Sequence, residues 1–426
     1  MSEKQLTFAP NGHVLTNAAV WSPDGQWIVY DVRSDPAGES FDGSRIERVN
    51  VETRDVQVLF ESKNGARCGV ATVCPKTGRV VFIRGPERPT ADWAYSPTHR
   101  QGLIVDPARP GEAVPLDARD LTPPFTAGAL RGGSHVHTFD TVGEWVAFTY
   151  EDHVLAEGRG EPNQRNVGVA VPGRAVVVPG THPRNHDGSH FSVLATRTVS
   201  DPRPGTDEIA KAFEESWIGS TGYLRPDGTR QKRGLAFQGQ VVSERGEVFS
   251  EVFVADLPDD VTVPSEDGPL QGTDTLRPRP PKGTEQRRLT FTANRKHPGL
   301  QGPRHWLRSS PDGSKIAFLM NDDAGIVQVW TVSPNGGRPV QRTQNPTGVA
   351  SAFTWSPDGN WIAHAMAGSV CVTDAKTGRT RPLTDPSHGP PRPEACVVSP
   401  DGNHIAFVRI MDEWNQIFVV NHEVLR

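Results

Sequence analysis

SPDGQWIVY, at residues 22–30, is the stretch of sequence that decides the fold, because close copies of it follow later in the chain. The copies are SPDGSKIAF at 310–318, SPDGNWIA at 356–363 and SPDGNHIAF at 399–407. In such a turn the proline fixes φ, the aspartate hydrogen-bonds to the backbone, and the glycine adopts the left-handed conformation before an apolar strand resumes. Each copy therefore predicts two strands joined by a tight turn.

The spacing of the copies predicts how these units are assembled. The last three recur about every 45 residues, which is the length of one four-stranded blade of a β-propeller. Weaker copies of the turn lie at 74–82, 139–148 and 186–194. Four clear and three weak copies make seven, so we predict an all-β protein, a seven-bladed β-propeller that forms a single domain over residues 1–426.

A second marker predicts how the ring closes. Leu-Thr pairs end the outer strand of a unit at 289–290 and 383–384, and residues 6–7 carry the same pair before any unit has begun. We therefore expect residues 4–9 to supply the outer strand of the last blade, near residues 393–425. Such a closure leaves no open sheet edge, which is how a radial array avoids edge-to-edge aggregation.

Two segments in the long gap before residue 310 depart from the repeat. Ile209, Phe213 and Trp217 fall on one face at helical spacing, so we predict a short helical insertion in blade 4, over about 203–219. Residues 259–283 are rich in Pro, Gly, Asp and Thr. This composition predicts a flexible surface loop.

Composition and charge disfavour several classes of function. The 426 residues include 45 Lys and Arg against 50 Asp and Glu, a net charge of −5, and no long basic stripe that could follow a nucleic-acid backbone. No stretch approaches the roughly 18 apolar residues of a membrane helix, and the first residues show no signal region. The four cysteines form no C-x-x-C pair and are expected to be reduced core thiols. We therefore expect a cytoplasmic protein that binds neither nucleic acid nor membrane, with its oligomeric state left open.

The candidate site follows from propeller geometry, in which the innermost strands surround a central channel and the loops leading into them bind ligands. The third unit contains RGGSHVHTF at 131–139, and in a strand of period two His135 and His137 point the same way. His190 and His305 precede strands at matching positions of the fourth and fifth units. We predict that these four histidines hold a divalent metal ion, with Mn, Zn, Fe and Ni not distinguished. The alternative is that they are hydrogen-bonded structural histidines.

Arginines flank these histidines. The guanidinium groups of Arg131, Arg304 and Arg308 match a carboxylate or a phosphate, so a metal beside them would form a site for anions. Structural ion pairing is the alternative for each arginine. The sequence contains no phosphate loop, G-x-S-x-G elbow, H-E-x-x-H motif or EF-hand loop. Nucleotide chemistry and nucleophilic hydrolysis therefore lack support.

Two resemblances to known families follow from these motifs. The SPDG repeats resemble those of TolB-like propeller proteins over nearly the whole chain, and the segments 128–153, 182–190 and 202–217 resemble an uncharacterised bacterial branch of that family. The segment from Ser134 to His137 is similar to the paired-histidine ligand segment of oligogalacturonate lyase, a seven-bladed, metal-dependent propeller enzyme. The pairs Ser189-His190 and Arg304-His305 look like the single-histidine segments of that family.

The second resemblance implies a chemistry. Such lyases break the bond β to a uronate carboxylate, and a metal with an arginine stabilises the charge that builds on this carboxylate as the C5 proton leaves. The resemblance thus implies catalytic roles for flanking arginines and for a general base. The candidates for the base are His153, His186 and Tyr223.

One main hypothesis and two alternatives result. The main hypothesis is a metal-dependent lyase whose substrate is a small anionic carbohydrate, a uronate-containing oligosaccharide. The first alternative is a non-catalytic TolB-like scaffold that binds a protein or peptide, and the second is a hydrolase or isomerase of another sugar acid. Bound metal would favour either enzyme over the scaffold. An unsaturated product would favour the lyase over the hydrolase or isomerase.

Overall fold

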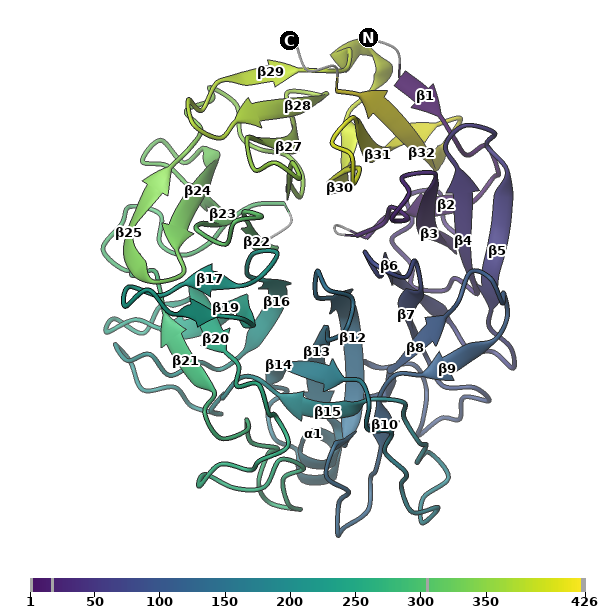
Figure 1. Ribbon diagram of the computed structural model, residues 1–426, viewed down its shortest axis with the longest axis vertical. Helices are drawn as coiled ribbons and strands as arrows, with labels where there is room; N and C mark the ends of the chain where they lie inside the picture. The colour runs from purple at the N-terminus through teal and green to yellow at the C-terminus, as the bar shows by residue number, and fades with distance from the viewer. Residues whose placement is uncertain (1–2, 17–18, 304–305, 423–426) are drawn as a thin grey trace.

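The computed structural model describes residues 3–16, 19–303 and 306–422. Over these residues the chain forms seven four-stranded sheets, which are arranged as blades around a central axis (Figure 1). The predicted all-β, seven-bladed propeller is confirmed. None of the helices in this part of the chain has the length and apolar character needed to cross a membrane.

The first three blades are built from consecutive strands, with the innermost strand first. Blade 1 contains β2 (Gly12–Val14), β3 (Trp27–Arg33), β4 (Arg45–Asn50) and β5 (Val56–Glu61). Blade 2 contains β6 (Cys68–Val73), β7 (Val80–Arg84), β8 (Gln101–Val105) and β9 (Ala113–Pro115). Blade 3 contains β12 (Gly132–Phe139), β13 (Val146–Asp152), β14 (Arg165–Val171) and β15 (Phe191–Leu194). A separate parallel pair is formed by β10 (Ala118–Arg119) and β11 (Ala129–Leu130).

The other four blades complete the ring. Blade 4 contains β16 (Ala212–Trp217), β19 (Gly234–Val242), β20 (Val248–Asp256) and β21 (Glu285–Arg288). Blade 5 contains β22 (Arg308–Ser309), β23 (Ile316–Asn321), β24 (Val327–Ser333) and β25 (Gly336–Gln341). Blade 6 contains β26 (Thr354–Trp355), β27 (Trp361–Met366), β28 (Ser369–Asp374) and β29 (Thr380–Pro382). Blade 7 contains β30 (Pro391–Val398), β31 (His404–Met411), β32 (Trp414–Asn421) and β1 (Glu3–Gln5).

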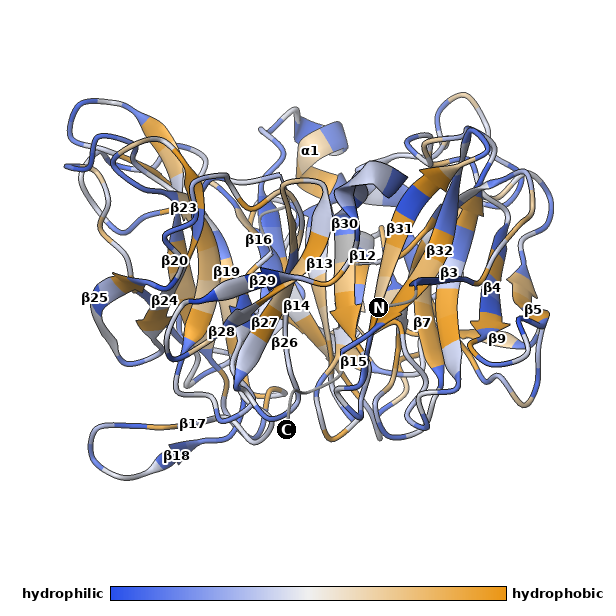
Figure 2. Cartoon of the chain, turned by 90° about the horizontal axis from the view of Figure 1, so that it is seen from above, coloured by the Kyte–Doolittle hydropathy of each residue, from blue (hydrophilic) through white to orange (hydrophobic). Residues whose placement is uncertain are grey.

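Helical turns and one hairpin occupy the loops. Helix α1 (His153–Arg159) joins β13 to β14, and the 3₁₀ turns are η1 (Pro97–His99) and η2 (Pro386–His388). The hairpin of β17 (Tyr223–Leu224) and β18 (Arg230–Gln231) projects from the face of the ring opposite to α1 (Figure 2). Corresponding strands of all blades run in the same direction, so the loops after β3, β7 and β13 all lie at the face that carries α1.

The repeated turns are held by the chemistry of their residues. In the first copy the Ser22 hydroxyl donates to Asp24 at 2.5 Å, and the backbone N–H of Gln26 donates to the same carboxylate at 3.0 Å. Gly25 has φ 70°, a left-handed conformation that glycine adopts at little cost. The copies at 310–318, 356–363 and 399–407 repeat these contacts. Local turn chemistry therefore sets the register of each inner hairpin.

The N-terminal strand completes the last blade. β1 pairs antiparallel with β32, with Glu3 opposite Val420, as the Leu-Thr marker led us to expect. Leu6 then enters the apolar cluster between blades 7 and 1 and is 1% exposed. Glu3 also pairs with the buried Arg409 of β31. Similar apolar clusters fill the space between other neighbouring blades, and all four cysteines are buried and unpaired.

The predicted helix over about 203–219 is wrong. The segment instead contains β16, the innermost strand of blade 4, and the α-helix of the described chain is α1, in blade 3. A β-bulge between Phe213 and Ser216, with Glu214 at φ 57°, shifts the alternation of side chains along β16. Residues four apart share one face of a regular strand as well as of a helix, so the spacing did not distinguish the two. The bulge in fact puts Phe213, opposite Gln238, and Trp217, opposite Leu235, on different faces of the sheet.

The fourth predicted turn is also misplaced. Residues 186–194 do not open blade 4; they lead into β15, the outer strand of blade 3. The two inner strands of blade 4, β16 and β19, are joined by residues 218–233, where Pro226-Asp227-Gly228 turns the separate β17–β18 hairpin and does not link the two strands directly. The expected flexible loop at 259–283 folds back with an isolated bridge between Pro264 and Pro281 and buries Leu270.

Candidate metal centre

A group of three metal-binding side chains lies on the face of the ring that carries α1. His99 ends η1, in the loop after β7 of blade 2, and His153 and Glu157 lie on α1, in the loop after β13 of blade 3. The spacing of four residues on a helix puts His153 and Glu157 on one side, about 5–6 Å apart at Cβ. Two blades thus bring together a set that could hold a divalent ion.

The distances within this group fit a single ion. His99 Nε2 lies 3.2 Å from His153 Nδ1 and 3.3 Å from Glu157 Oε1, and His153 Nδ1 lies 3.3 Å from Glu157 Oε2. An ion with ligand bonds of about 2.1 Å and tetrahedral or octahedral angles separates neighbouring ligand atoms by about 3.0–3.4 Å. The three side chains therefore stand at the separations that shared coordination requires.

Hydrogen bonds orient the ligand atoms toward one another. His99 Nδ1 donates to the carbonyl of Ala94 at 2.7 Å, so a neutral His99 turns the lone pair of Nε2 toward Glu157. A metal-bound histidine typically donates its other N–H to a carbonyl in this way. The Thr98 hydroxyl donates to Glu157 Oε1 at 2.6 Å. His153 Nδ1 carries one hydrogen at most, but two acceptors face it, His99 Nε2 and Glu157 Oε2. A cation between His99, His153 and Glu157 would satisfy all three side chains.

The surroundings favour the protonation states that bind metal. Burial lowers the pKa of His99 and the pKa of His153, so both imidazoles stay neutral at neutral pH. For Glu157, burial acts in the opposite sense, but its pKa is lowered overall, and the hydrogen bonds from Thr98 and His153 act in that direction. Neutral imidazoles and an ionised carboxylate are the forms that coordinate metals.

An indole covers the group on one side. The ring of Trp93 stacks on His99 with centroids 3.7 Å apart and meets His153 edge-on at 4.8 Å. The guanidinium groups of Arg119 and Arg184 lie 5.7 and 5.8 Å from the centre of the same indole. A hollow beside this indole is lined by Glu87, Arg88, Thr90, Asp92, Trp93, His182, Pro183 and Arg184. Cationic and aromatic groups therefore adjoin the metal ligands.

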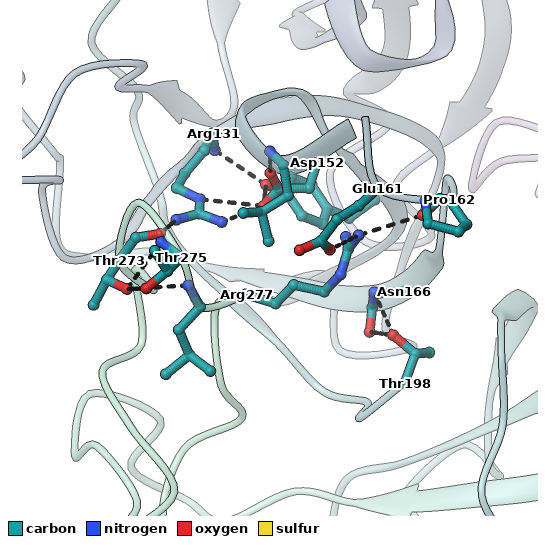
Figure 3. Close-up of polar contacts among 12 residues, drawn as sticks. Arg131, Asp152, Glu161, Pro162, Asn166, Thr198, Thr273, Thr275 and Arg277 are labelled. Atoms are coloured by element: carbon teal, nitrogen blue, oxygen red, sulfur yellow. Dashed lines mark hydrogen bonds and ion pairs between the residues drawn. The ribbon is translucent and has the colours of Figure 1, made fainter. Parts of the chain in front are cut away.

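Arg131 positions the helix that carries two of the ligands (Figure 3). It is fully buried and pairs with Asp152, at 3.1 Å from Nε and 2.7 Å from Nη2. Asp152 in turn caps α1 by accepting from Leu155 N at 2.9 Å. The carbonyl of Arg131 accepts from His153 N, and its Nη1 donates to Thr273 O in the 259–283 segment. Arg131 is thus a structural ion-pair partner and does not face a substrate.

The predicted pair His135 and His137 does not point the same way. A β-bulge lies between His135, opposite Thr149, and Thr138, opposite Ala147, so three residues of β12 span two of β13. The extra residue, Val136 at φ 55°, puts His135 and Thr138 on one face and His137 on the other. His137 Nε2 bonds to Ser134 Oγ at 3.1 Å inside the protein, and His135 Nδ1 lies 3.9 Å from Glu151.

The other predicted ligands do not join this pair. His190 precedes the outer strand β15, and its Nδ1 lies 2.9 Å from Ser189 Oγ. Its prediction rested on the misplaced fourth unit. His305 and Arg304 lie outside the residues that the structure describes. Within the described residues, the group of three candidate ligands is His99, His153 and Glu157, and the predicted set around His135 is not formed.

The remaining predicted residues occupy separate places. His186 is half-buried, with Nδ1 3.2 Å from the Gln101 amide nitrogen, and burial lowers its pKa to about 3. The Tyr223 hydroxyl donates to Asp256, so it is a buried structural group. Arg308 is buried in β22, where burial lowers its pKa to about 10 and Glu214 and Glu215 oppose this effect. His153, proposed as a base, instead belongs to the metal group.

Sequence reasoning missed His99 and Glu157. The pair at 153 and 157 carries a signal, a histidine and a glutamate four residues apart, but it is useful only once the helix is known. His99 offers no such signal, because it stands on a loop of another blade, outside every repeat. The contact between His99 and His153 spans 54 residues of sequence and is set by the packing of two blades.

Comparisons with known proteins place this geometry in context. Residues 67–186, which include all three metal-binding side chains, match the family described as "Protein of unknown function (DUF3748)". The "Uncharacterized protein YidR" of Escherichia coli (strain K12) is 46% identical over 414 residues, which cover 96% of each chain.

Two solved structures are similar in fold. Oligogalacturonate lyase in complex with manganese has 11% identity and a TM-score of 0.59, and the match covers 98% of this chain and 92% of that chain. A putative TolB from Agrobacterium tumefaciens has 16% identity and a TM-score of 0.41, with 89% and 99% covered. Oligogalacturonate lyase, one of the two families that the repeats resemble, is therefore among the structural neighbours.

Proposed function

We propose that this chain, which belongs to the family of the Escherichia coli protein YidR, is a metal-dependent lyase that acts on uronate-containing oligosaccharides. The observation that carries the proposal is the group of His99, His153 and Glu157, with ligand atoms 3.2–3.3 Å apart. Two imidazoles and one carboxylate leave coordination positions open for water and substrate. Donors of this kind suit Mn, Fe and Zn, and the set alone does not choose among them.

The surroundings of the group suit an acidic substrate. A divalent ion bound here would attract the carboxylate of a uronate and stabilise the negative charge that builds on it. The Arg184 guanidinium lines the hollow beside Trp93 and can hold the carboxylate or a neighbouring one. In the elimination a base takes the C5 proton, the C4–O bond breaks, a C4=C5 double bond forms and the leaving oxygen gains a proton.

The structural comparison adds support of a limited kind. The likeness to manganese-bound oligogalacturonate lyase extends over nearly all of both chains. At 11% identity this likeness supports a shared fold. The ligand set proposed for this chain is inferred from its own residues and is not transferred from the lyase. The proposal therefore depends on the residues of blades 2 and 3, and it would fall if they bound no metal.

The first experiment measures metal in protein purified without a polyhistidine tag. We expect about one equivalent of a divalent metal, and less than a tenth of that amount in the double variant His99→Ala/Glu157→Gln. The control is His388→Ala, whose imidazole is 57% exposed and lies outside the group. Substoichiometric metal that is the same in wild type and in the double variant would contradict the metal site.

The second experiment follows ultraviolet absorbance over a panel of oligouronides. The conjugated double bond of an unsaturated uronate absorbs, so we expect an increase with wild type and none with His99→Ala/Glu157→Gln. Bound metal without an unsaturated product would contradict the lyase and favour hydrolysis or isomerisation of a sugar acid. A metal-free protein without turnover would favour the non-catalytic scaffold.

A further inference from the structure

A cavity of about 550 Å³ opens at the centre of the ring. Its walls come from the inner strands of blades 1, 2, 3 and 7 and from the loop after β3. They include the polar side chains of Arg33, Glu39, Thr138, Trp306, Arg392 and Glu394. We call it the channel-mouth cavity. Because the loop after β3 lies at the face that carries α1, this cavity and the metal group share one face.

Two uncharged hydrogen-bond donors in this cavity have no acceptor within the described chain, and the same holds for Nε of Arg33 and Nε of Arg392. Trp306 Nε1 and Thr138 Oγ1 are shielded from solvent and make no hydrogen bond within the described chain. The indoles of four other tryptophans, by contrast, each donate to a backbone carbonyl at 2.9–3.1 Å: Trp21, Trp217, Trp330 and Trp355. Buried polar groups are nearly always bonded, so these two donors suit a ligand that brings acceptors.

Charged groups border the same space. Arg33 is 6% exposed and pairs with Asp31 at 2.5 Å, while its Nε has no hydrogen-bond partner. On the other wall Arg392 pairs with Glu39 at 3.5 Å and with Glu394 at 3.6 Å. Glu39 is largely exposed, so its contribution inside the cavity is screened by solvent. Glu394 is 15% exposed and its charge is opposed by Arg392, so the inner part of the cavity offers guanidinium groups, neutral donors and one paired carboxylate.

A stack of alternating rings and guanidinium groups leads from this cavity to the metal group. Arg33 lies 4.4 Å from the centre of Phe41, and Phe41 stacks on Tyr95 with centroids 4.6 Å apart. Arg100 lies over Tyr95 at 5.5 Å and donates to its hydroxyl at 3.0 Å. Arg100 directly follows His99 in the chain. The stack therefore connects a residue of the cavity wall, Arg33, with the residue that follows His99.

We infer that the channel-mouth cavity binds a second acidic sugar ring of the same oligosaccharide, an identity that rests on the proposed function. The carboxylate and hydroxyl oxygens of this ring accept from Trp306 Nε1, Thr138 Oγ1 and Arg33. A volume of about 550 Å³ accommodates one such ring, because ligand pockets span about 300–1,000 Å³.

The test uses the whole chain stripped of metal with a chelator, and a trimer of galacturonic acid as the probe. Thr138→Val removes one hydroxyl at constant shape, and Trp306→Phe removes the N–H and keeps an aromatic ring. We expect calorimetry to give about fivefold weaker binding for each variant, the effect of one lost hydrogen bond. A neutral trisaccharide, maltotriose, should bind at least about tenfold more weakly than the acidic trimer, as expected when charge-assisted bonds are lost.

The controls separate this inference from the proposed function. Thr229→Val, at the tip of the exposed β17–β18 hairpin, should bind as wild type, and thermal unfolding checks that each variant is folded. Because binding is measured on the metal-free protein, this site can hold even if no lyase activity is found. Unchanged affinity in both Thr138→Val and Trp306→Phe, no binding at all, or equal binding of maltotriose would overturn the inference.

Discussion

Replacing Arg131 with methionine tests the support of the metal group. The change removes a buried guanidinium and leaves Asp152, itself 0% exposed, without its counterion. Breaking a buried pair in this way costs about 3–5 kcal/mol, because a charge stays behind without compensation. At about 2.1 cal/mol/K per residue, 426 residues lose about 0.9 kcal/mol per kelvin at the midpoint, so Tm should fall by about 3–6 °C. Metal affinity should fall about tenfold, since Asp152 caps the helix that carries His153 and Glu157.

Differential scanning calorimetry and a competitive metal titration measure the two effects. The matched control is Arg109→Met, which breaks a pair with Glu112 whose side chains are 69% and 72% exposed. Exposed pairs contribute little, so this control should shift Tm by less than about 1 °C. Adding Asp152→Asn to Arg131→Met removes the stranded charge, and the double variant should be more stable than Arg131→Met alone. If Arg131→Met unfolded within 1 °C of the control and bound metal normally, the positioning role would be refuted.

Two further predictions concern stability. Burial raises the pKa of Glu215 to about 7 from an ordinary value of 4.5, so the folded state keeps a proton that the unfolded state releases between these pH values. The protonated form stabilises the fold fully below pH 4.5, and this stabilisation is lost as pH rises to about 7. Above pH 7 the unfolding free energy of Glu215→Gln should therefore exceed that of wild type by up to about 3 kcal/mol. A difference in unfolding free energy between variant and wild type that is the same at pH 5 and at pH 8 would argue against this. Deleting residues 3–9 exposes the edge of β32 and removes the buried Leu6, so light scattering should detect aggregation, which a synthetic peptide of these residues should suppress.

The blade count follows from the sequence because turn chemistry is local. Ser22, Asp24 and Gly25 make their bonds within a few residues, and three further copies do the same. The fourth blade was not recognised because the connection between its two inner strands holds the additional β17–β18 hairpin, and the Pro226-Asp227-Gly228 turn belongs to that hairpin. The Asp187-Gly188 pair, which resembles the motif, leads into an outer strand instead.

The candidate site was harder to predict for two physical reasons. A β-bulge changes which face each later side chain occupies, and valine at position 136 gives no warning of a left-handed residue. The metal group also depends on packing between blades, which brings the loop of His99 to the helix of His153. The structure does contain a group with two histidines that could hold a metal ion, but neither belongs to the predicted set of His135, His137, His190 and His305.

Because β1 pairs with β32, the last blade cannot be completed until almost the whole chain has been synthesised. Roughly 400 residues separate the two strands, and a ribosome adds about 5–20 residues per second. The first strand must therefore wait about 20–80 s for its partner to leave the ribosome. During that interval β2 to β29 can stack blade upon blade, but the seam stays open, and a chaperone that shields residues 3–9 would act in this window.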